Sequence, residues 1–126
     1  MPTRFRELFK TVAEDRLAVT KHPHGGLMIF PQPQWLQFRE KIMVATLDDQ
    51  WLRRELLGYS MELDLDKTGR LLISPELREE ARLKPTEAAV LLGVGNYLEL
   101  WDKATYDEQR SRSSEQIRQG FKQLAF

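Results

Sequence analysis

The residues best suited to chemistry gather at one predicted turn, Asp66-Lys67-Thr68-Gly69-Arg70. Lys67 and Arg70 lie beside a glycine, so this tip can approach another molecule closely. A lysine contacts phosphates as a point charge, and an arginine can donate to both acceptors on a guanine edge. The Asp66 carboxylate can cross the turn to hold the Arg70 guanidinium and can accept hydrogen bonds from turn amides. The pattern fits a nucleic-acid contact, and it also fits a well-made turn whose charges are simply solvated.

Two arginines near the N-terminus are secondary candidates for the same contact. Arg4 and Arg6 lie in a short apolar and basic segment, and the pair Arg6-Glu7 recurs as Arg78-Glu79. A repeated Arg-Glu pair is more typical of an ion pair within or between subunits than of a nucleic-acid contact.

Catalytic and metal-binding interpretations have little support in the sequence. His22 and His24 form a His-x-His pair with no third ligand nearby, so a proline-containing turn explains them better than a metal site. Glu62, Asp64 and Asp66 resemble a carboxylate cluster, but their alternation with apolar residues is typical of the solvated face of a strand. The chain also has no cysteine and no glycine-rich phosphate loop. We therefore expect no enzyme, no metal site and no cofactor.

The candidate turn should lie at the tip of a β-hairpin. Met61, Leu63 and Leu65 alternate with acidic residues, which predicts a strand with one buried face. Gly69 tolerates the positive φ of a tight turn, and Arg70 is expected to open the second strand of the hairpin, which continues through 71–73.

Flanking patterns predict short helices and two further pairs of strands. The expected strands are Leu17 to Thr20, Gly26 to Phe30, Ala88 to Leu92 and Asn96 to Trp101. The expected helices are Arg4 to Lys10, a helix from Pro33 with Trp35, Phe38 and Ile42 on one face, a helix from the N-cap Asp48 through Leu52 and Leu56 to Gly58, and a helix from the N-cap Ser74 and Pro75 to Arg82.

The C-terminal segment is predicted to be an amphipathic helix. Ile117, Phe121 and Leu124 are spaced at i, i+4 and i+7 among polar residues, and Ser113 with Gln116 has the pattern of a capping box. The apolar stripe is expected to pack on its own domain, with a contact between subunits as the alternative.

Two pairs of similar segments occur in the same order in the two halves of the chain, which indicates an incomplete duplication. The aligned segments are Thr3 to Glu7 with Pro75 to Glu79, and Leu27 to Phe30 plus Trp35 with Tyr97 to Trp101 plus Tyr106. The expected units are a first repeat over 1–47, a connecting helix over 48–60, a second repeat over 61–107 and a C-terminal helix over 108–126.

Composition limits the classes of partner. The 126 residues are 41% hydrophobic, and 19 basic residues balance 19 acidic residues. No overall field attracts nucleic acid, so binding would need a local patch or many copies of a weak one. No apolar run reaches the roughly 20 residues of a membrane span, and absent cysteines fit a reducing compartment, so a cytoplasmic location is the default.

The chain as a whole resembles the MraZ family of bacterial transcriptional regulators of the division and cell wall gene cluster. The resemblance is carried by Asp66-Lys67-Thr68-Gly69-Arg70-Leu71-Leu72-Ile73-Ser74-Pro75, by the opening Pro-Thr-Arg-Phe-Arg-Glu, by Trp-Asp after the last strand and by the helical insert between the repeats.

The resemblance implies an α+β fold of two SpoVT-AbrB-like swapped-hairpin barrel modules that assemble into a ring-shaped homo-oligomer. It also implies binding to promoter DNA with direct repeats, at the nucleoid, through an Asp-x-x-x-Arg motif in each repeat. The second motif matches at Asp66 and Arg70, whereas the first N-terminal hairpin has no counterpart in this sequence. The first repeat should therefore leave strand edges open at Leu17 to Thr20 and Gly26 to Phe30, unless another chain or a neighbour in the ring covers them.

Two other classes remain open from the sequence. Swapped-hairpin domains also serve as protein-interaction or assembly modules, which would need no DNA binding. A small enzyme using the acidic strand is the third class.

Overall fold

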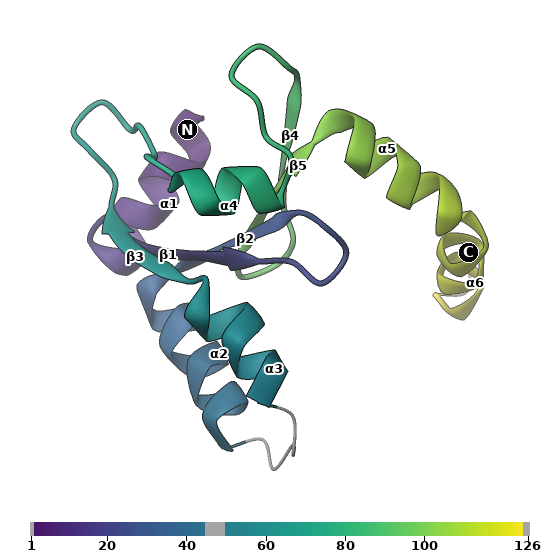
Figure 1. Ribbon diagram of the computed structural model, residues 1–126, viewed down its shortest axis with the longest axis horizontal. Coiled ribbons are helices and arrows are strands. Elements are labelled where there is room, and N and C mark those ends of the chain that lie inside the picture. The colour runs from purple at the N-terminus through teal and green to yellow at the C-terminus, as the bar shows by residue number, and fades with distance from the viewer. Residues whose placement is uncertain (1, 45–49, 125–126) are drawn as a thin grey trace.

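The chain is built around one five-stranded antiparallel sheet, shown in a computed structural model that describes residues 2–44 and 50–124 (Figure 1). The strand order is β3-β1-β2-β5-β4. The strands are β1 Arg16–Lys21, β2 Leu27–Pro31, β3 Met61–Asp64, β4 Ala89–Gly93 and β5 Leu98–Asp102. The helices are α1 Thr3–Ala13, α2 Gln32–Val44, α3 Gln50–Arg53 with its π-helical continuation η1 Arg54–Gly58, α4 Pro75–Glu80, α5 Lys103–Arg112 and α6 Ser114–Gln123. The expected α+β class is confirmed.

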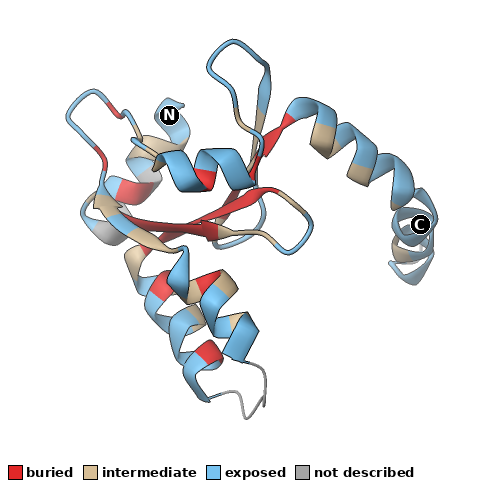
Figure 2. Ribbon diagram, in the orientation of Figure 1, coloured by how far each residue is buried: buried red, intermediate tan, exposed pale blue. Residues whose placement is uncertain are grey.

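Strands β1 and β2 are buried on both faces, which explains the unbroken apolar run of β2 (Figure 2). Helices α1 and α4 lie on one side of the sheet, and α2 and α3 lie on the other (Figure 1). One buried cluster comprises Phe9, Leu17, Val19, Leu27, Ile29, Leu65, Leu77, Ala81 and Leu98. The second comprises Ala18, Met28, Phe30, Trp35, Ile42 and Leu56.

Most of the predicted elements are present, with small shifts at their ends. The α4 helix begins as expected, because the Ser74 side chain accepts a hydrogen bond from the Leu77 amide and Pro75 opens the first turn. The helix predicted from Asp48 continues through a buried Leu56 and ends at Gly58, but Asp48 itself lies outside the described residues.

The predicted second strand of the hairpin, 71–73, is wrong. Strand β3 has the expected alternation, but it pairs with β1 and not with this segment. Leu71 and Ile73 instead pack their side chains against the buried cluster under α1 and α4. The Ser74 amide donates a hydrogen bond to the Met61 sulfur at 3.3 Å, and not to a backbone carbonyl of β3. Burial of these side chains therefore decides the path of the chain after the turn.

The expected open edges of the first repeat are also wrong. Strand β1 lies between β2 and β3, and β2 lies between β1 and β5. The edges of the sheet are β3 and β4. Strand β5 from the second predicted repeat covers the edge of β2, so both predicted repeats share one sheet. The predicted domain boundaries and the swapped hairpins stay predictions.

The C-terminal arm, α5 and α6, extends away from the sheet (Figure 1). The predicted capping box is wrong, because the Ser113 side chain makes no capping hydrogen bond and its backbone closes α5 instead. The apolar stripe does not pack on the domain as expected: Ile117, Phe121 and Leu124 are 44%, 55% and 71% exposed.

Candidate nucleic-acid interface

The Asp66 carboxylate organises the predicted turn. Its Oδ1 atom accepts hydrogen bonds from the Thr68 amide at 2.9 Å, the Thr68 hydroxyl at 2.8 Å and the Arg70 amide at 2.7 Å. The Arg70 backbone hydrogen bond, followed by the Thr68 hydroxyl, lowers the pKa of Asp66 below its usual value. The charged carboxylate therefore holds the turn in one shape, as the sequence predicted.

The Arg70 side chain is oriented by the same two residues. Its Nε donates to the Thr68 hydroxyl at 3.1 Å and lies 3.3 Å from Asp66 Oδ2. The side chain is still 76% exposed. Because these contacts involve Nε, the terminal guanidinium nitrogens can serve a bidentate contact with an external acceptor. Thr68 thus has a specific orienting role that the sequence alone did not reveal.

The glycine of the turn lies against helix α1. Gly69 has a φ of 76° and is buried, and a Cβ at this position would come within 2.4 Å of Cδ and Nε of Arg6. Gly69 thus satisfies the left-handed turn and the close approach of Arg6 at once. The structure brings the secondary candidate Arg6 to the turn.

Arg4 is placed differently from Arg6. Its guanidinium lies 4.5 Å from the centre of the neighbouring Phe5 ring. The intramolecular ion pair considered for the repeated Arg-Glu segments is not formed by Arg6 or Arg78 among the residues that the structure describes.

A cleft of about 360 Å³ separates the turn from α1. The basic and acidic side chains that line the cleft are equal in number. The loop 65–74 projects beyond the cleft at one end of the molecule (Figure 1). The lining residues are Thr3, Arg6, Glu7, Lys10, Asp15, Leu65, Asp66, Lys67 and Gly69. The positive charge available to a DNA backbone therefore comes from the tip, at Lys67 and Arg70, and not from a broad basic surface.

The structure also contains a buried polar network that was not predicted from the sequence. Glu99, 9% exposed, accepts hydrogen bonds from the Trp101 indole at 3.0 Å and the Tyr97 hydroxyl at 3.2 Å. His22 Nε2 lies 3.0 Å from the same carboxylate, and His22 Nδ1 accepts from the His24 amide at 3.0 Å. Tyr97, Glu99 and Trp101 alternate along the predicted strand Asn96 to Trp101, and this alternation could have revealed their shared face.

This network explains the His-x-His pair in structural terms. Burial lowers the pKa of His22 below its usual value, although Glu99 acts in the opposite direction. A neutral imidazole that donates from Nε2 and accepts at Nδ1 satisfies both observed partners. No group of three potential ligands is arranged to hold a metal ion within the part of the chain that the structure describes.

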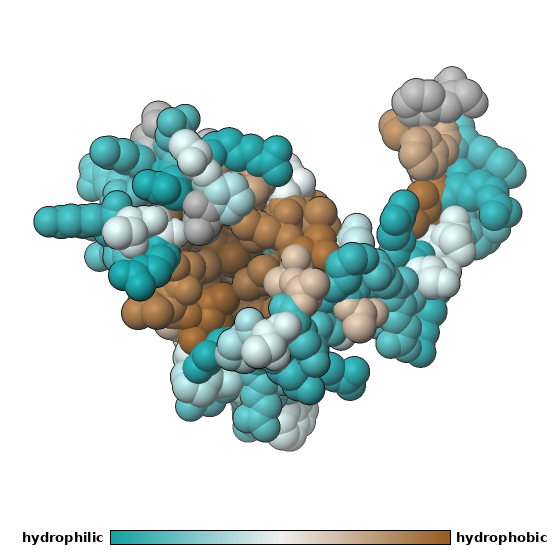
Figure 3. Space-filling model, turned by 90° about the horizontal axis from the view of Figure 1, so that it is seen from above, coloured by the Kyte–Doolittle hydropathy of each residue, from teal (hydrophilic) through white to brown (hydrophobic). Residues whose placement is uncertain are grey.

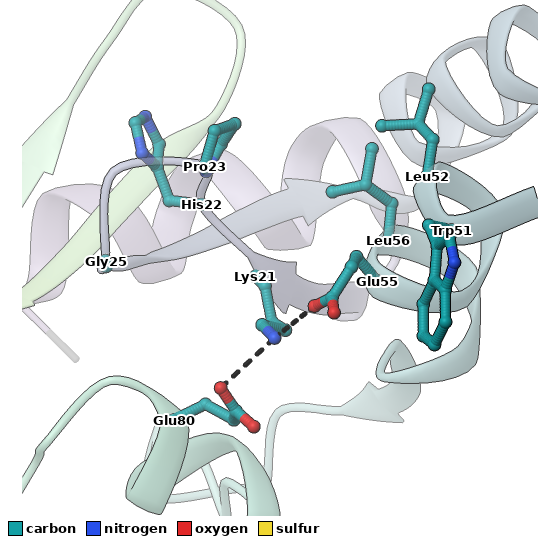
Figure 4. A pocket seen from close by; sticks show the side chains of 10 residues that line it. Lys21, His22, Pro23, Gly25, Trp51, Leu52, Glu55, Leu56 and Glu80 are labelled. Atoms are coloured by element: carbon teal, nitrogen blue, oxygen red, sulfur yellow. Dashed lines mark hydrogen bonds and ion pairs between the residues drawn. The ribbon is translucent and has the colours of Figure 1, made fainter. Parts of the chain in front are cut away.

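A second cavity, of about 440 Å³, lies between the helical insert and α4 (Figure 4). At its centre Lys21 forms ion pairs with Glu55 and with Glu80, the latter at 3.1 Å. Burial lowers the pKa of Lys21, but the two carboxylates outweigh it and raise that pKa above its usual value. We call this cavity the Trp51 groove, and its lining is Lys21, His22, Pro23, Gly25, Gly26, Trp51, Leu52, Glu55, Leu56 and Glu80. These residues come from segments that are far apart in the sequence, so no local motif predicted the site.

None of the described helices has the length and apolar character required to cross a bilayer.

Comparison with known proteins identifies the family. Residues 56–125 match the profile of a family described as "MraZ protein, putative antitoxin-like". "Transcriptional regulator MraZ" of Delftia acidovorans is 47% identical, and the alignment covers 100% of this chain and 88% of the relative. The proteins of the same name from Polaromonas sp. and Burkholderia cenocepacia are 50% and 46% identical, over 88% and 92% of this chain and 77% and 80% of the relatives. The expected resemblance is confirmed, and the chain belongs to the MraZ family.

Proposed function

We propose that this chain is a sequence-specific DNA-binding transcriptional regulator of the bacterial division and cell wall gene cluster, acting in the cytoplasm at the nucleoid. The observation that carries the proposal is the ordered tip, in which Asp66 and Thr68 orient an exposed Arg70. The relatives' name, transcriptional regulator, supports the same function.

In this proposal the tip enters a groove of double-stranded DNA. Arg70 donates to the O6 and N7 acceptors of a guanine, and Lys67 contacts a phosphate. Asp66 and Thr68 position the arginine without touching the DNA, and Gly69 with Arg6 behind it keeps the tip narrow. Arg6 adds positive charge near the backbone, and Arg4 is a further secondary contact.

We also propose that the tips act together in a ring-shaped homo-oligomer built from swapped hairpins. Segment 71–73, which follows the turn, is not paired in the sheet, and Leu72 is 78% exposed. Figure 3 shows a hollowed apolar surface on the side of the sheet from which the loops project, typical of a face that another chain covers. Several tips on successive direct repeats of a promoter would bind at high effective concentration, which compensates for a chain of zero net charge.

The test compares Arg70→Ala with Arg39→Ala, since both remove one exposed positive charge and Arg39 lies on α2, away from the tip. Binding is measured by fluorescence anisotropy, over a salt series, on promoter DNA upstream of the chain's own operon. We expect Arg70→Ala to lose about 1 to 3 kcal/mol per tip on the operator, whereas Arg39→Ala should behave like the parent. Equal operator affinity of Arg70→Ala and the parent would reject the assigned role.

An assembly module without DNA binding of its own is the second candidate. The exposed apolar stripe on α6 and the zero net charge favour it. That function predicts no operator binding at any salt concentration, whereas DNA binding predicts an affinity that falls steeply with salt.

A further inference from the structure

The end of the C-terminal arm presents an apolar stripe to its surroundings. Ile117 and Phe121 on α6, and Leu124 at its C-cap, lie along one side of the helix over about 10 Å. They are 44%, 55% and 71% exposed. Gly120 lies beside them, and a Cβ there would meet nothing within 4 Å, so a partner surface can approach closely. A cluster of large apolar side chains at this exposure is typical of a protein contact.

The Trp51 groove has the features of a matching acceptor. Pro23, Leu52 and Leu56 line it, and Trp51, at its rim, is 64% exposed (Figure 4). Its volume of about 440 Å³ is large enough to admit side chains from another helix. Amphipathic helices bind such grooves through anchors at i, i+4 and i+7, which is the spacing of the stripe on α6.

The charges of the two surfaces are complementary. Glu55 and Glu80 share the single ammonium of Lys21, so the floor of the groove carries a net negative charge. With Glu115, Arg118 and Lys122, α6 carries one net positive charge. Arg118 pairs with Glu115 at 3.1 Å and follows Ile117 by one residue, about 100° around the helix, so it flanks the stripe. Docking of the stripe would bring this cation toward the two carboxylates and favour one orientation of the helix over the reverse.

We infer that the stripe Ile117, Phe121 and Leu124 of one copy docks into the Trp51 groove of a second copy of this chain. A second copy is the occupant because the arm carrying the stripe extends away from its own sheet (Figures 1 and 3). The donor and acceptor surfaces differ, so the contact is head-to-tail and continues from copy to copy until a ring closes. The inference deepens the proposed self-assembly and rests on it.

Cysteine cross-linking tests the contact directly, because the chain has no native cysteine. One preparation carries Leu52→Cys in the groove and the other carries Leu124→Cys in the stripe, so any disulfide between them joins two molecules. The matched control is Gln119→Cys, on the opposite face of α6. After mixing and mild oxidation, we expect the groove variant to form at least about tenfold more disulfide-linked dimer with Leu124→Cys than with Gln119→Cys.

A second measurement guards against misfolding of a cysteine variant. Phe121→Glu should weaken association, followed by light scattering over a dilution series, by about tenfold or more, because a charge would be buried in an apolar contact. Gln119→Glu should leave association unchanged, and circular dichroism should show the parent's helix content in both.

The outcomes separate this contact from self-assembly in general. Assembly of the parent without preferential cross-linking between Leu52→Cys and Leu124→Cys would overturn the docking and leave the self-assembly proposal standing. A parent chain that stays monomeric at all concentrations would overturn both. Equally efficient cross-linking of Leu124→Cys with itself would show that stripe meets stripe, and would also overturn the docking.

Discussion

The role of Asp66 gives the sharpest test of the candidate interface, because two effects of removing its carboxylate have opposite signs. Asp66→Ala removes a negative charge beside the DNA, which by simple electrostatics should strengthen binding to any sequence. The same change removes the acceptor for the Thr68 and Arg70 amides and the Oδ2 contact 3.3 Å from Arg70 Nε. If the geometry of the tip matters, binding to the operator should weaken.

The expected size follows from the ordering of one long side chain. Fixing a rotamer-rich side chain at an interface costs about 0.5 to 1.5 kcal/mol, which the parent has already met by holding Arg70 in place. Releasing Arg70 should therefore weaken operator binding about two- to tenfold for each engaged tip. Binding to unrelated DNA should stay equal or become tighter, so the ratio of operator affinity to affinity for unrelated DNA falls by at least as much as the operator affinity itself.

Asp64→Ala is the matched control for this prediction. Asp64 is exposed, lies at the end of β3 two residues before Asp66, and carries the same charge. Anisotropy titrations of both variants on operator and scrambled DNA, at two salt concentrations, separate charge from geometry. If Asp64→Ala and Asp66→Ala changed operator affinity in the same direction and by the same factor, the carboxylate would act through its charge and the orienting role would be refuted.

Three further predictions concern the scaffold of the site. Leu65→Ala should reduce the free energy of unfolding by about 2 to 5 kcal/mol in urea titrations, because Leu65 is buried, whereas Leu36→Ala, at an exposed position on α2, should change it by less than about 0.5 kcal/mol. Gly26→Ala should cost about 1 to 3 kcal/mol, because its Cβ would come within 2.6 Å of the Trp101 ring, and the melting temperature will show it. Burial lowers the pKa of His22 in the folded state, so its contribution to stability should be full above the unfolded pKa of about 6.5 and should fall as the pH decreases below that value. Between about pH 7.5 and 5.5, the melting temperature of His22→Gln should therefore fall less than that of the parent.

The turn and the strand β3 before it were predictable because their determinants are local. The alternation from Met61 to Leu65 sets the strand, the positive φ of Gly69 sets the turn, and the spacing between Asp66 and Arg70 lets the carboxylate reach both the amides and the guanidinium. Each of these properties depends on residues within a few positions of one another, so the local sequence is sufficient to predict the strand and the turn.

The surroundings of the turn were not predictable, since they depend on contacts across the fold. Arg6 meets Gly69 because α1 and the loop both lie on the same side of the sheet. Lys21, Glu55 and Glu80 meet because a strand, the helical insert and α4 converge on one cavity. Nothing in the types or spacing of these residues specifies the partner, since a charged residue in a helix is usually solvated.

The error at 71–73 has a physical reason. Strand propensity and a preceding turn are sufficient to predict a hairpin, but a strand also needs a partner edge. The first strand of the predicted hairpin, β3, finds that edge on β1, with Met61 opposite Val19 and Asp64 opposite Arg16. Segment 71–73 instead packs Leu71 and Ile73 against the core and leaves Leu72 exposed.

In the proposed function, the zero net charge of this chain makes assembly part of the binding mechanism. Two cations at a tip, Lys67 and Arg70, neutralise few phosphates, so one tip alone binds DNA weakly and with a shallow dependence on salt. Linked tips turn each later contact into an intramolecular event, and affinity then rises with the number of tips that match repeats in the DNA. If the proposed assembly uses the apolar surfaces left exposed by one copy, at segment 71–73 and on α6, these surfaces are needed for recognition as much as the polar tip, because they decide how many tips a promoter meets at once.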